Sequence, residues 1–149
     1  MIEISAGDTA WIMVCTALVM LMTHGLALFY GGMVRKKNIL SMMALCFLTL
    51  TLVSVQWVLI GYTLAFGTDI SGVIGGMDFL FFKGVGQLPN PDFSDNIPHI
   101  AFSIFQMMFA VITVAIIGSA FAERAKFGSY AIFALLWVTI VYCPIAHWV

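Results

Sequence analysis

Long apolar runs without Asp, Glu, Lys or Arg dominate this chain and limit what it can fold into. A helix that crosses about 30 Å of hydrocarbon needs roughly 20 mostly apolar residues. Four charge-free runs reach that length, at residues 9–34, 38–68, 96–122 and 127–149. A chain of 149 residues that is 62% hydrophobic and 9% charged cannot be arranged as a soluble globule. The sequence therefore predicts an all-α integral membrane protein.

The predicted elements follow from these runs. We expect transmembrane helices at about 9–34, 38–66, 98–122 and 127–148, with a long connection at about 67–97. A β-barrel would instead need segments of about ten residues with alternating hydrophobicity. An apolar patch at 77–82 is too short to span, and there we expect a short interfacial helix or a re-entrant piece.

The charges predict the orientation of the bundle. Most acidic residues lie at the N-terminus or in the 67–97 connection. Positive residues close to membrane spans mark cytoplasmic connections. We therefore expect an external N-terminus and an external 67–97 connection, in a multi-pass protein of the cell membrane. The basic residues that set this orientation lie in the first and third connections: Arg35, Lys36, Lys37, Arg124 and Lys126.

Polar side chains inside the spans are candidates for function, because they are costly in lipid unless they pair or line a wet cavity. His24 needs a partner on a neighbouring helix, and an interhelical hydrogen bond is the simplest interpretation for it and for Gln56. His99 lies near the external boundary, where water can satisfy it. The three cysteines fall inside spans without paired spacing, which indicates buried thiols.

The third predicted helix carries a stripe of phenylalanines. Phe102, Phe105 and Phe109 are spaced i, i+3 and i+7, with Gln106 on the same side. Such a stripe is typical of packing or of lipid contact. An aromatic ring also attracts an ammonium-type cation, by about 0.5–2 kcal/mol. The residues alone leave both interpretations open.

Five motifs carry a family resemblance. In order they are FYGGMVRKKN (29–38), GYTLAFG (61–67), FQMMFAVIT (105–113), AERAKF (122–127) and PIAHWV (144–149). Together, at these separations, they resemble the first four helices of the Amt/Mep/Rh ammonium transporters. The resemblance implies an eleven-helix subunit, usually in a homotrimer, with one narrow hydrophobic pore that recruits ammonium and deprotonates it.

The resemblance also implies roles for single residues. Phe109 matches the outer of two stacked gate rings, Gln106 a vestibule amide, and Thr63 a vestibule hydroxyl that is usually serine. Trp148 is assigned to the interfacial aromatic belt, because the substrate-binding tryptophan of the family would follow Val149. A PII-type signalling protein is an implied cytoplasmic partner near 35–38 and 123–126.

Residues 1–149 are thus expected to form the N-terminal part of one ammonium-transporter membrane domain, with ammonium or ammonia as substrate. An ammonium sensor with the same membrane module fused to a signalling domain is an open alternative, and so is a non-conducting fragment. No carboxylate pair, metal-ligand cluster or phosphate-binding loop stands out in the sequence. We therefore expect no enzyme, metal, cofactor or nucleic-acid partner.

Overall fold

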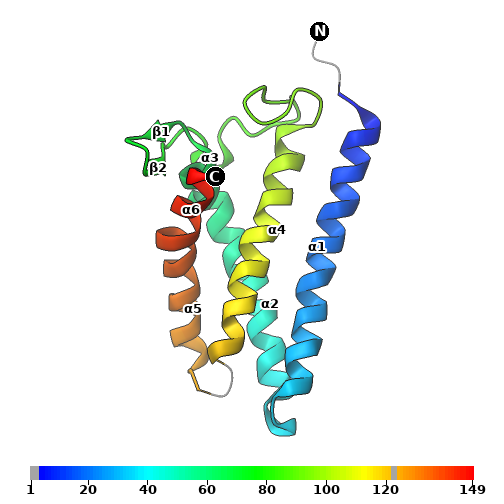
Figure 1. The fold of residues 1–149 in the computed structure, drawn as a ribbon, viewed down its shortest axis with the longest axis vertical. Coiled ribbons are helices and arrows are strands. Elements are labelled where there is room, and N and C mark those ends of the chain that lie inside the picture. Colours follow the sequence, from blue (N-terminus) through cyan, green and yellow to red (C-terminus); the bar gives the residue numbers. More distant parts are fainter. Residues whose placement is uncertain (1–3, 122–123) are drawn as a thin grey trace.

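The computed structural model describes residues 4–121 and 124–149. Within them, four helices are long and apolar enough to cross a membrane. They run along the long axis of the molecule (Figure 1). The prediction of an all-α membrane bundle is confirmed. The spans are Ala6–Met33, Lys36–Phe66, His99–Phe121 and Phe127–Trp148.

Two of these spans are built from several helical pieces. The second contains the turn η1 (Lys36–Asn38), α2 (Ile39–Gln56), the π-helical turn η2 (Trp57–Gly61) and α3 (Tyr62–Phe66). The fourth contains α5 (Phe127–Trp137), the π-helical turn η5 (Val138–Tyr142) and α6 (Cys143–Trp148). The first span is α1 (Ala6–Met33), and the third is α4 (His99–Gly118) followed by the turn η4 (Ser119–Phe121).

The two π-helical turns contact each other across the bundle. Gln56 Nε2 donates to Thr139 Oγ1 at 3.0 Å, and the Cys143 thiol donates to the Gly61 carbonyl at 3.5 Å. A π turn holds one extra residue and disturbs the regular backbone bonding. These side-chain contacts therefore join the second and fourth spans where both helices are irregular.

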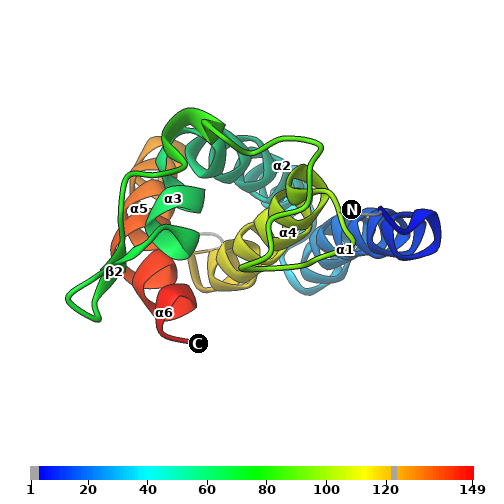
Figure 2. The same ribbon diagram turned by 90° about the horizontal axis from the view of Figure 1, so that it is seen from above.

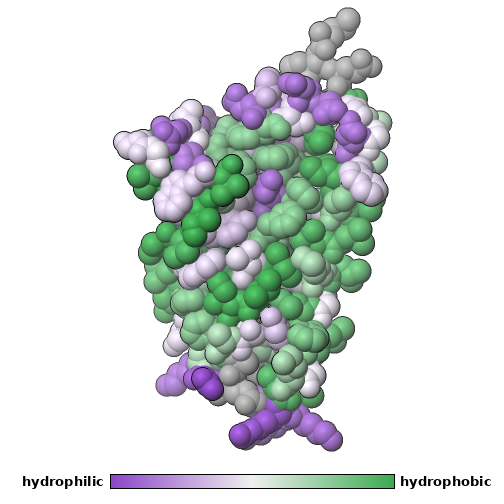
Figure 3. Space-filling model, viewed as in Figure 1, coloured by the Kyte–Doolittle hydropathy of each residue, from purple (hydrophilic) through white to green (hydrophobic). Residues whose placement is uncertain are grey.

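The helices alternate in direction, so α1 begins and α6 ends at the same end of the bundle (Figure 1). We call this the loop end, because it also carries the 67–98 connection. The opposite end carries Arg35–Lys37 and Arg124–Lys126 and is called the basic end. Figure 3 shows hydrophobic side chains over the middle of one face and hydrophilic ones at both ends, as expected for a protein that crosses a bilayer.

The start of α1 is fixed by polar contacts. The Ser5 hydroxyl accepts from the Asp8 backbone N–H at 3.2 Å, which caps the helix. Asn96, just before α4, donates to the Asp8 carboxylate at 2.5 Å, and its carbonyl accepts from Ser5 N at 3.0 Å. The first span is thereby attached to the segment that leads into the third.

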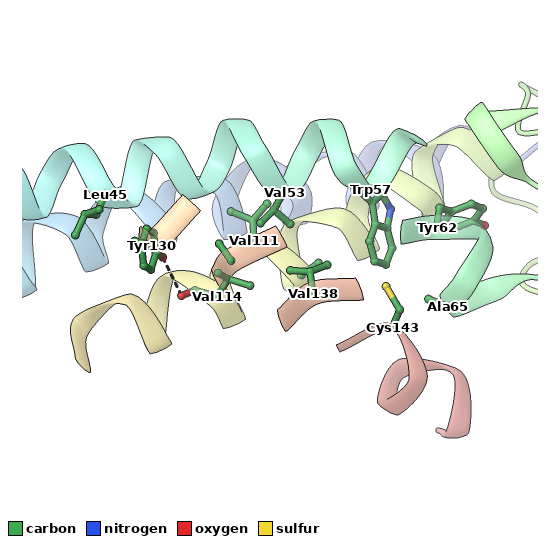
Figure 4. Packing of buried hydrophobic residues seen from close by; sticks show 12 residues of the cluster. Leu45, Val53, Trp57, Tyr62, Ala65, Val111, Val114, Tyr130, Val138 and Cys143 are labelled. Carbon is green, nitrogen blue, oxygen red and sulfur yellow. Dashed lines mark hydrogen bonds between the residues drawn. The ribbon is translucent and has the colours of Figure 1, made fainter. Parts of the chain in front are cut away.

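Viewed from above, α4 lies between α1 and the column of α5 and α6, with α2 beside it (Figure 2). Contacts join α4 closely to α1 and α2 and only weakly to α5. The core lies along α2, α4 and α5 and includes Val53, Trp57 and Val111 (Figure 4). Near the basic end, the Tyr130 hydroxyl lies 2.7 Å from Thr49 Oγ1 and donates to the Val114 carbonyl at 3.3 Å. Tyr130 thus links α2, α4 and α5.

Tyr130→Phe is expected to lower the free energy of unfolding by about 0.6–1.5 kcal/mol, the usual range for hydrogen bonds between membrane helices. The ring is buried, so its packing remains while the hydroxyl contacts are lost. Thermal unfolding in detergent measures the change. Tyr142→Phe is the matched control, because the Tyr142 hydroxyl has no hydrogen bond within the described residues. Equal melting temperatures for both variants would contradict the prediction.

The 67–98 connection folds back onto the loop end. It contains a small antiparallel hairpin, β1 (Asp69–Ile70) and β2 (Ile74–Gly75), and one 3₁₀ turn, η3 (Leu80–Phe82). The patch at 77–82 therefore contains a short 3₁₀ turn, in place of the short interfacial helix or re-entrant piece that we expected. Phe79 and Phe82 each pack on Tyr62 with ring centroids 5.5 Å apart. This contact with the first residue of α3 uses the apolar side chains that suggested a membrane segment.

Candidate functional site

One face of α4 is left uncovered by the other helices. Phe109 is 37% exposed and Ile116 is 49% exposed, although Ala110 and Val111 beside them are fully buried. Phe105 and Thr113 are partly exposed and lie one helical turn to either side of Phe109. We call these four residues (Phe105, Phe109, Thr113 and Ile116) the α4 stripe.

The two phenylalanines of the stripe form an edge-to-face pair. Their ring centroids are 5.0 Å apart and the ring planes meet at 80°, a favoured geometry for aromatic rings. The Thr113 hydroxyl donates to the Phe109 carbonyl at 2.7 Å within the helix, so this hydroxyl is already satisfied. The stripe therefore presents aromatic and aliphatic surface.

Gln106 lies beside this aromatic pair on α4. It is half-buried, and its amide takes part in no hydrogen bond within residues 4–121 and 124–149. An amide oxygen accepts hydrogen bonds and an amide nitrogen donates two. Phe109 and Gln106, predicted together as site residues, thus share one helix and leave both a ring and an amide available.

Thr63 is placed differently. It is 1% exposed, its hydroxyl donates to the Gly76 carbonyl at 2.7 Å, and the same oxygen accepts from Phe79 N–H at 3.0 Å. In the described part of the chain no hydrogen bond joins Thr63 to Gln106. The observed contacts of Thr63 hold the 67–98 connection on α3, and its role near the substrate stays a prediction.

The position of α4 depends on residues that sequence reasoning did not select. Trp57 Nε1 donates to the Ser103 carbonyl at 3.2 Å, and the Tyr62 hydroxyl lies 2.5 Å from His99 Nε2. The expectation that water satisfies His99 is wrong, because the residue is 3% exposed. Its ring lies 5.4 Å from that of Phe93, in a stacked arrangement. The 67–98 connection covers His99, and the sequence near Pro98 carries no sign of this.

The other two polar residues of the spans have separate roles. His24 Nδ1 donates to the Met20 carbonyl of its own helix at 2.8 Å. Within the described residues, the ring does not make the hydrogen bond to a neighbouring helix that we expected. Its contact with α2 is instead the ring of Phe47, at 5.0 Å. Gln56 does make the interhelical bond, to Thr139, while its buried Oε1 has no partner within the described residues.

Polar contacts at the loop end involve the 67–98 connection. Thr68 donates to Asp78 Oδ2 through its hydroxyl at 2.6 Å and its backbone N–H at 2.8 Å, and these bonds hold the pKa of Asp78 below its usual value. Trp148 is 61% exposed, and its Nε1 donates to the Val73 carbonyl at 2.9 Å. This bond attaches the ring to the hairpin. Within the described residues, no group of three or more His, Cys, Asp or Glu could hold a metal ion.

Comparison with solved structures gives close matches to this arrangement. Candida albicans Mep2 superposes with a TM-score of 0.87 at 34% identity, over 98% of this chain and 32% of that one. A structure described as a sensor Amt protein has a TM-score of 0.85 at 26% identity, over 95% of this chain and 33% of that one.

Sequence comparison agrees with the structural matches. An ammonium transporter of Bacillus subtilis is 54% identical over 96% of this chain, and ammonium transporter Amt1 of Archaeoglobus fulgidus is 46% identical over 97%. The chain spans about a third of the length of these relatives, 35% and 34%. The profile of the Ammonium Transporter Family matches residues 10–149. The chain therefore belongs to the ammonium transporter family.

Proposed function

We propose that this chain supplies part of the conduction path of an ammonium transporter, with the α4 stripe and Gln106 facing that path. The observation that carries the proposal is the uncovered Phe105–Phe109 pair beside a free amide, in a chain whose relatives are named ammonium transporters. Ammonium approaches the ring of Phe109, and the Gln106 oxygen accepts one of its N–H groups in place of lost water.

The apolar character of the stripe supports passage of the substrate as ammonia. On the basic-end side of the aromatic pair, the Thr113 hydroxyl is bonded within the helix and Ile116 is aliphatic. An unpaired cation pays heavily for entering such surroundings, whereas a neutral molecule does not. Deprotonation near Phe109 therefore favours passage, and it excludes K⁺, which has no proton to lose.

Orientation and assembly belong to the same proposal. Arg35–Lys37 and Arg124–Lys126 at the basic end support a cytoplasmic location for that end and an external location for the loop end in the cell membrane. A homotrimer, a PII-type partner at the basic end, and one membrane domain that includes 1–149 remain predictions from the family resemblance.

Phe109→Ala is expected to reduce ammonium-evoked current about tenfold, because a desolvated cation–ring contact is worth up to about 2 kcal/mol. The test uses a chimera in which this chain replaces the matching segment of the B. subtilis transporter, reconstituted for solid-supported-membrane recording. Phe29→Ala is the matched control, since Phe29 is 62% exposed on α1 and lies outside the stripe.

Three outcomes of this recording bear on the proposal. A current from the chimera that Phe109→Ala reduces and Phe29→Ala leaves unchanged supports it. Equal loss in both variants contradicts the placement of the path on the α4 stripe. A silent chimera that still binds ammonium, beside a conducting B. subtilis transporter, favours the sensor alternative, which has a structural neighbour described as a sensor.

A further inference from the structure

His147 on α6 has an oxygen acceptor at each ring nitrogen. Nδ1 lies 3.0 Å from the Ala65 carbonyl oxygen, and Nε2 lies 3.0 Å from Asp69 Oδ1. A carbonyl and an ionised carboxylate can only accept, and a neutral imidazole carries a single N–H. Both contacts can be hydrogen bonds only if the ring carries two protons and is an imidazolium.

Both oxygens beside the ring carry negative charge. Ala65 is in the last turn of α3, where backbone carbonyls lack helical partners and carry the negative end of the helix dipole. The hydrogen bond from His147, followed by that from Gly72 N–H, holds the pKa of Asp69 below its usual value, so the carboxylate is ionised over a wide range of pH. The ring therefore lies between two negative groups.

Other titratable groups near α6 are engaged elsewhere. α3, β2 and η5 pack against this helix. The Tyr62 hydroxyl of α3 bonds His99, the Tyr142 ring of η5 packs on Trp57, and β2 has no titratable side chain. On α6 itself, the Cys143 thiol bonds Gly61. Asp69 is thus the charged group that faces His147 in the described structure.

The part held by this contact is the β1–β2 hairpin. Its strands have two residues each, and Ile70 and Val73 near its tip are more than half exposed. Asp69 fixes the turn by accepting from Gly72 N–H at 3.0 Å. Two side chains of α6 reach the hairpin: His147 bonds Asp69, and Trp148 bonds the Val73 carbonyl. So short a hairpin depends on such contacts for its order.

We propose that His147 is a pH-sensitive latch, which clamps the β1–β2 hairpin to α6 as an imidazolium and releases it when one proton is lost. After that loss, one ring nitrogen presents a lone pair to an oxygen and repels it. The Ala65 side of the ring is the more enclosed, because Ala65 is 2% exposed whereas the Asp69 side chain is 58% exposed. Release therefore occurs at Asp69, and the Asp69–Gly72 turn of the hairpin loosens while the Trp148–Val73 bond and the close approach of Gly75 to α3 remain.

The pH window follows from the two groups. The contact needs the Asp69 carboxylate ionised, so it is lost at low pH, as pH falls through the lowered pKa of that group. It also needs an N–H on each ring nitrogen of His147, so it is lost when the imidazolium gives up one of its two protons. The latch is closed between these limits. This inference does not depend on transport, because it concerns the order of the hairpin alone.

Nitrogen-15 NMR of the three histidines, on the chain in lipid nanodiscs between about pH 5 and 8, tests the proposal. We expect the doubly protonated signature for His147 at the acidic end. Once corrected for intrinsic rates, hydrogen exchange of the hairpin amides should become about three- to tenfold faster at the alkaline end, as for a partly exposed charge-assisted bond. The His99 signal reports that the fold is intact, because this ring is buried against Tyr62.

Two variants make the test specific. In Asp69→Asn the side-chain amide can accept from a protonated nitrogen or donate to a bare one, so the pH step in exchange should disappear. Asp78→Asn is the control, because Asp78 bonds Thr68 and does not contact His147, and the step should remain. A singly protonated His147 at the acidic end, or a step that survives in Asp69→Asn, would overturn the proposal.

Discussion

Gly75→Ala is expected to lower the free energy of unfolding by about 3 kcal/mol, the upper part of the range for overpacking. A Cβ atom at this position would lie 2.5 Å from the Thr63 carbonyl oxygen, 2.9 Å from the Leu64 carbonyl oxygen and 2.9 Å from Gly67 N. All three are backbone atoms at the end of α3, which cannot turn aside as a flexible side chain can. Thermal unfolding in detergent, followed by circular dichroism, measures the loss.

Gly86→Ala is the matched control for this prediction. Gly86 lies in the same connection, and a Cβ atom there would meet nothing within 4 Å. Its melting temperature should stay close to that of the unmodified chain. If the two variants melt together, the close approach of β2 to the end of α3 is not present in the protein. Limited proteolysis of the 67–98 connection gives a second measure, since Gly75→Ala should expose this segment to cleavage.

The spans could be predicted from the sequence because they depend on local properties. Hydrophobic length and the absence of charge decide whether a segment crosses a bilayer, and both are properties of neighbouring residues. The same holds for the Phe105–Phe109 pair, whose common side follows from helical periodicity alone. What the sequence could not give is the side of α4 that α1 and α2 cover, which decides that Phe109 is left exposed.

Contacts between residues distant in sequence could not be predicted from local sequence patterns. Tyr62 and His99 are 37 residues apart, and Thr49 and Tyr130 are 81 apart. A histidine near a membrane boundary is normally satisfied by water, and only the fold of the 67–98 connection places aromatic rings over His99. The π-helical turns could not be predicted either, because residues 57–61 show no local departure from a helical pattern.

The family resemblance and the structure give the Thr63 hydroxyl different roles. The resemblance assigns this position to the vestibule, whereas the structure gives its oxygen two backbone partners, Gly76 and Phe79. Both partners belong to the connection that also carries Gly75. The end of α3 and this connection therefore form one unit, held by a hydroxyl and by close backbone contact.

Thr63→Val is expected to lower the free energy of unfolding by about 2–4 kcal/mol. Valine has nearly the same shape, so packing is kept, but the Gly76 carbonyl and the Phe79 N–H lose their bonds to the hydroxyl at a buried position. Each polar group left unsatisfied in this way costs about 1–3 kcal/mol. Chemical or thermal unfolding of both proteins in the same detergent provides the comparison.

Thr63→Ser separates the hydroxyl from the rest of the side chain. Serine retains the oxygen that bonds Gly76 and Phe79 and removes only a methyl group, so a loss of about 0.5–1.5 kcal/mol is expected. A serine variant as unstable as the valine variant would mean that the methyl group, and not the hydroxyl, holds the connection. If valine leaves stability unchanged but abolishes ammonium current in the chimera, the Thr63 oxygen is free to contact substrate, and the role implied by the family resemblance is the correct one.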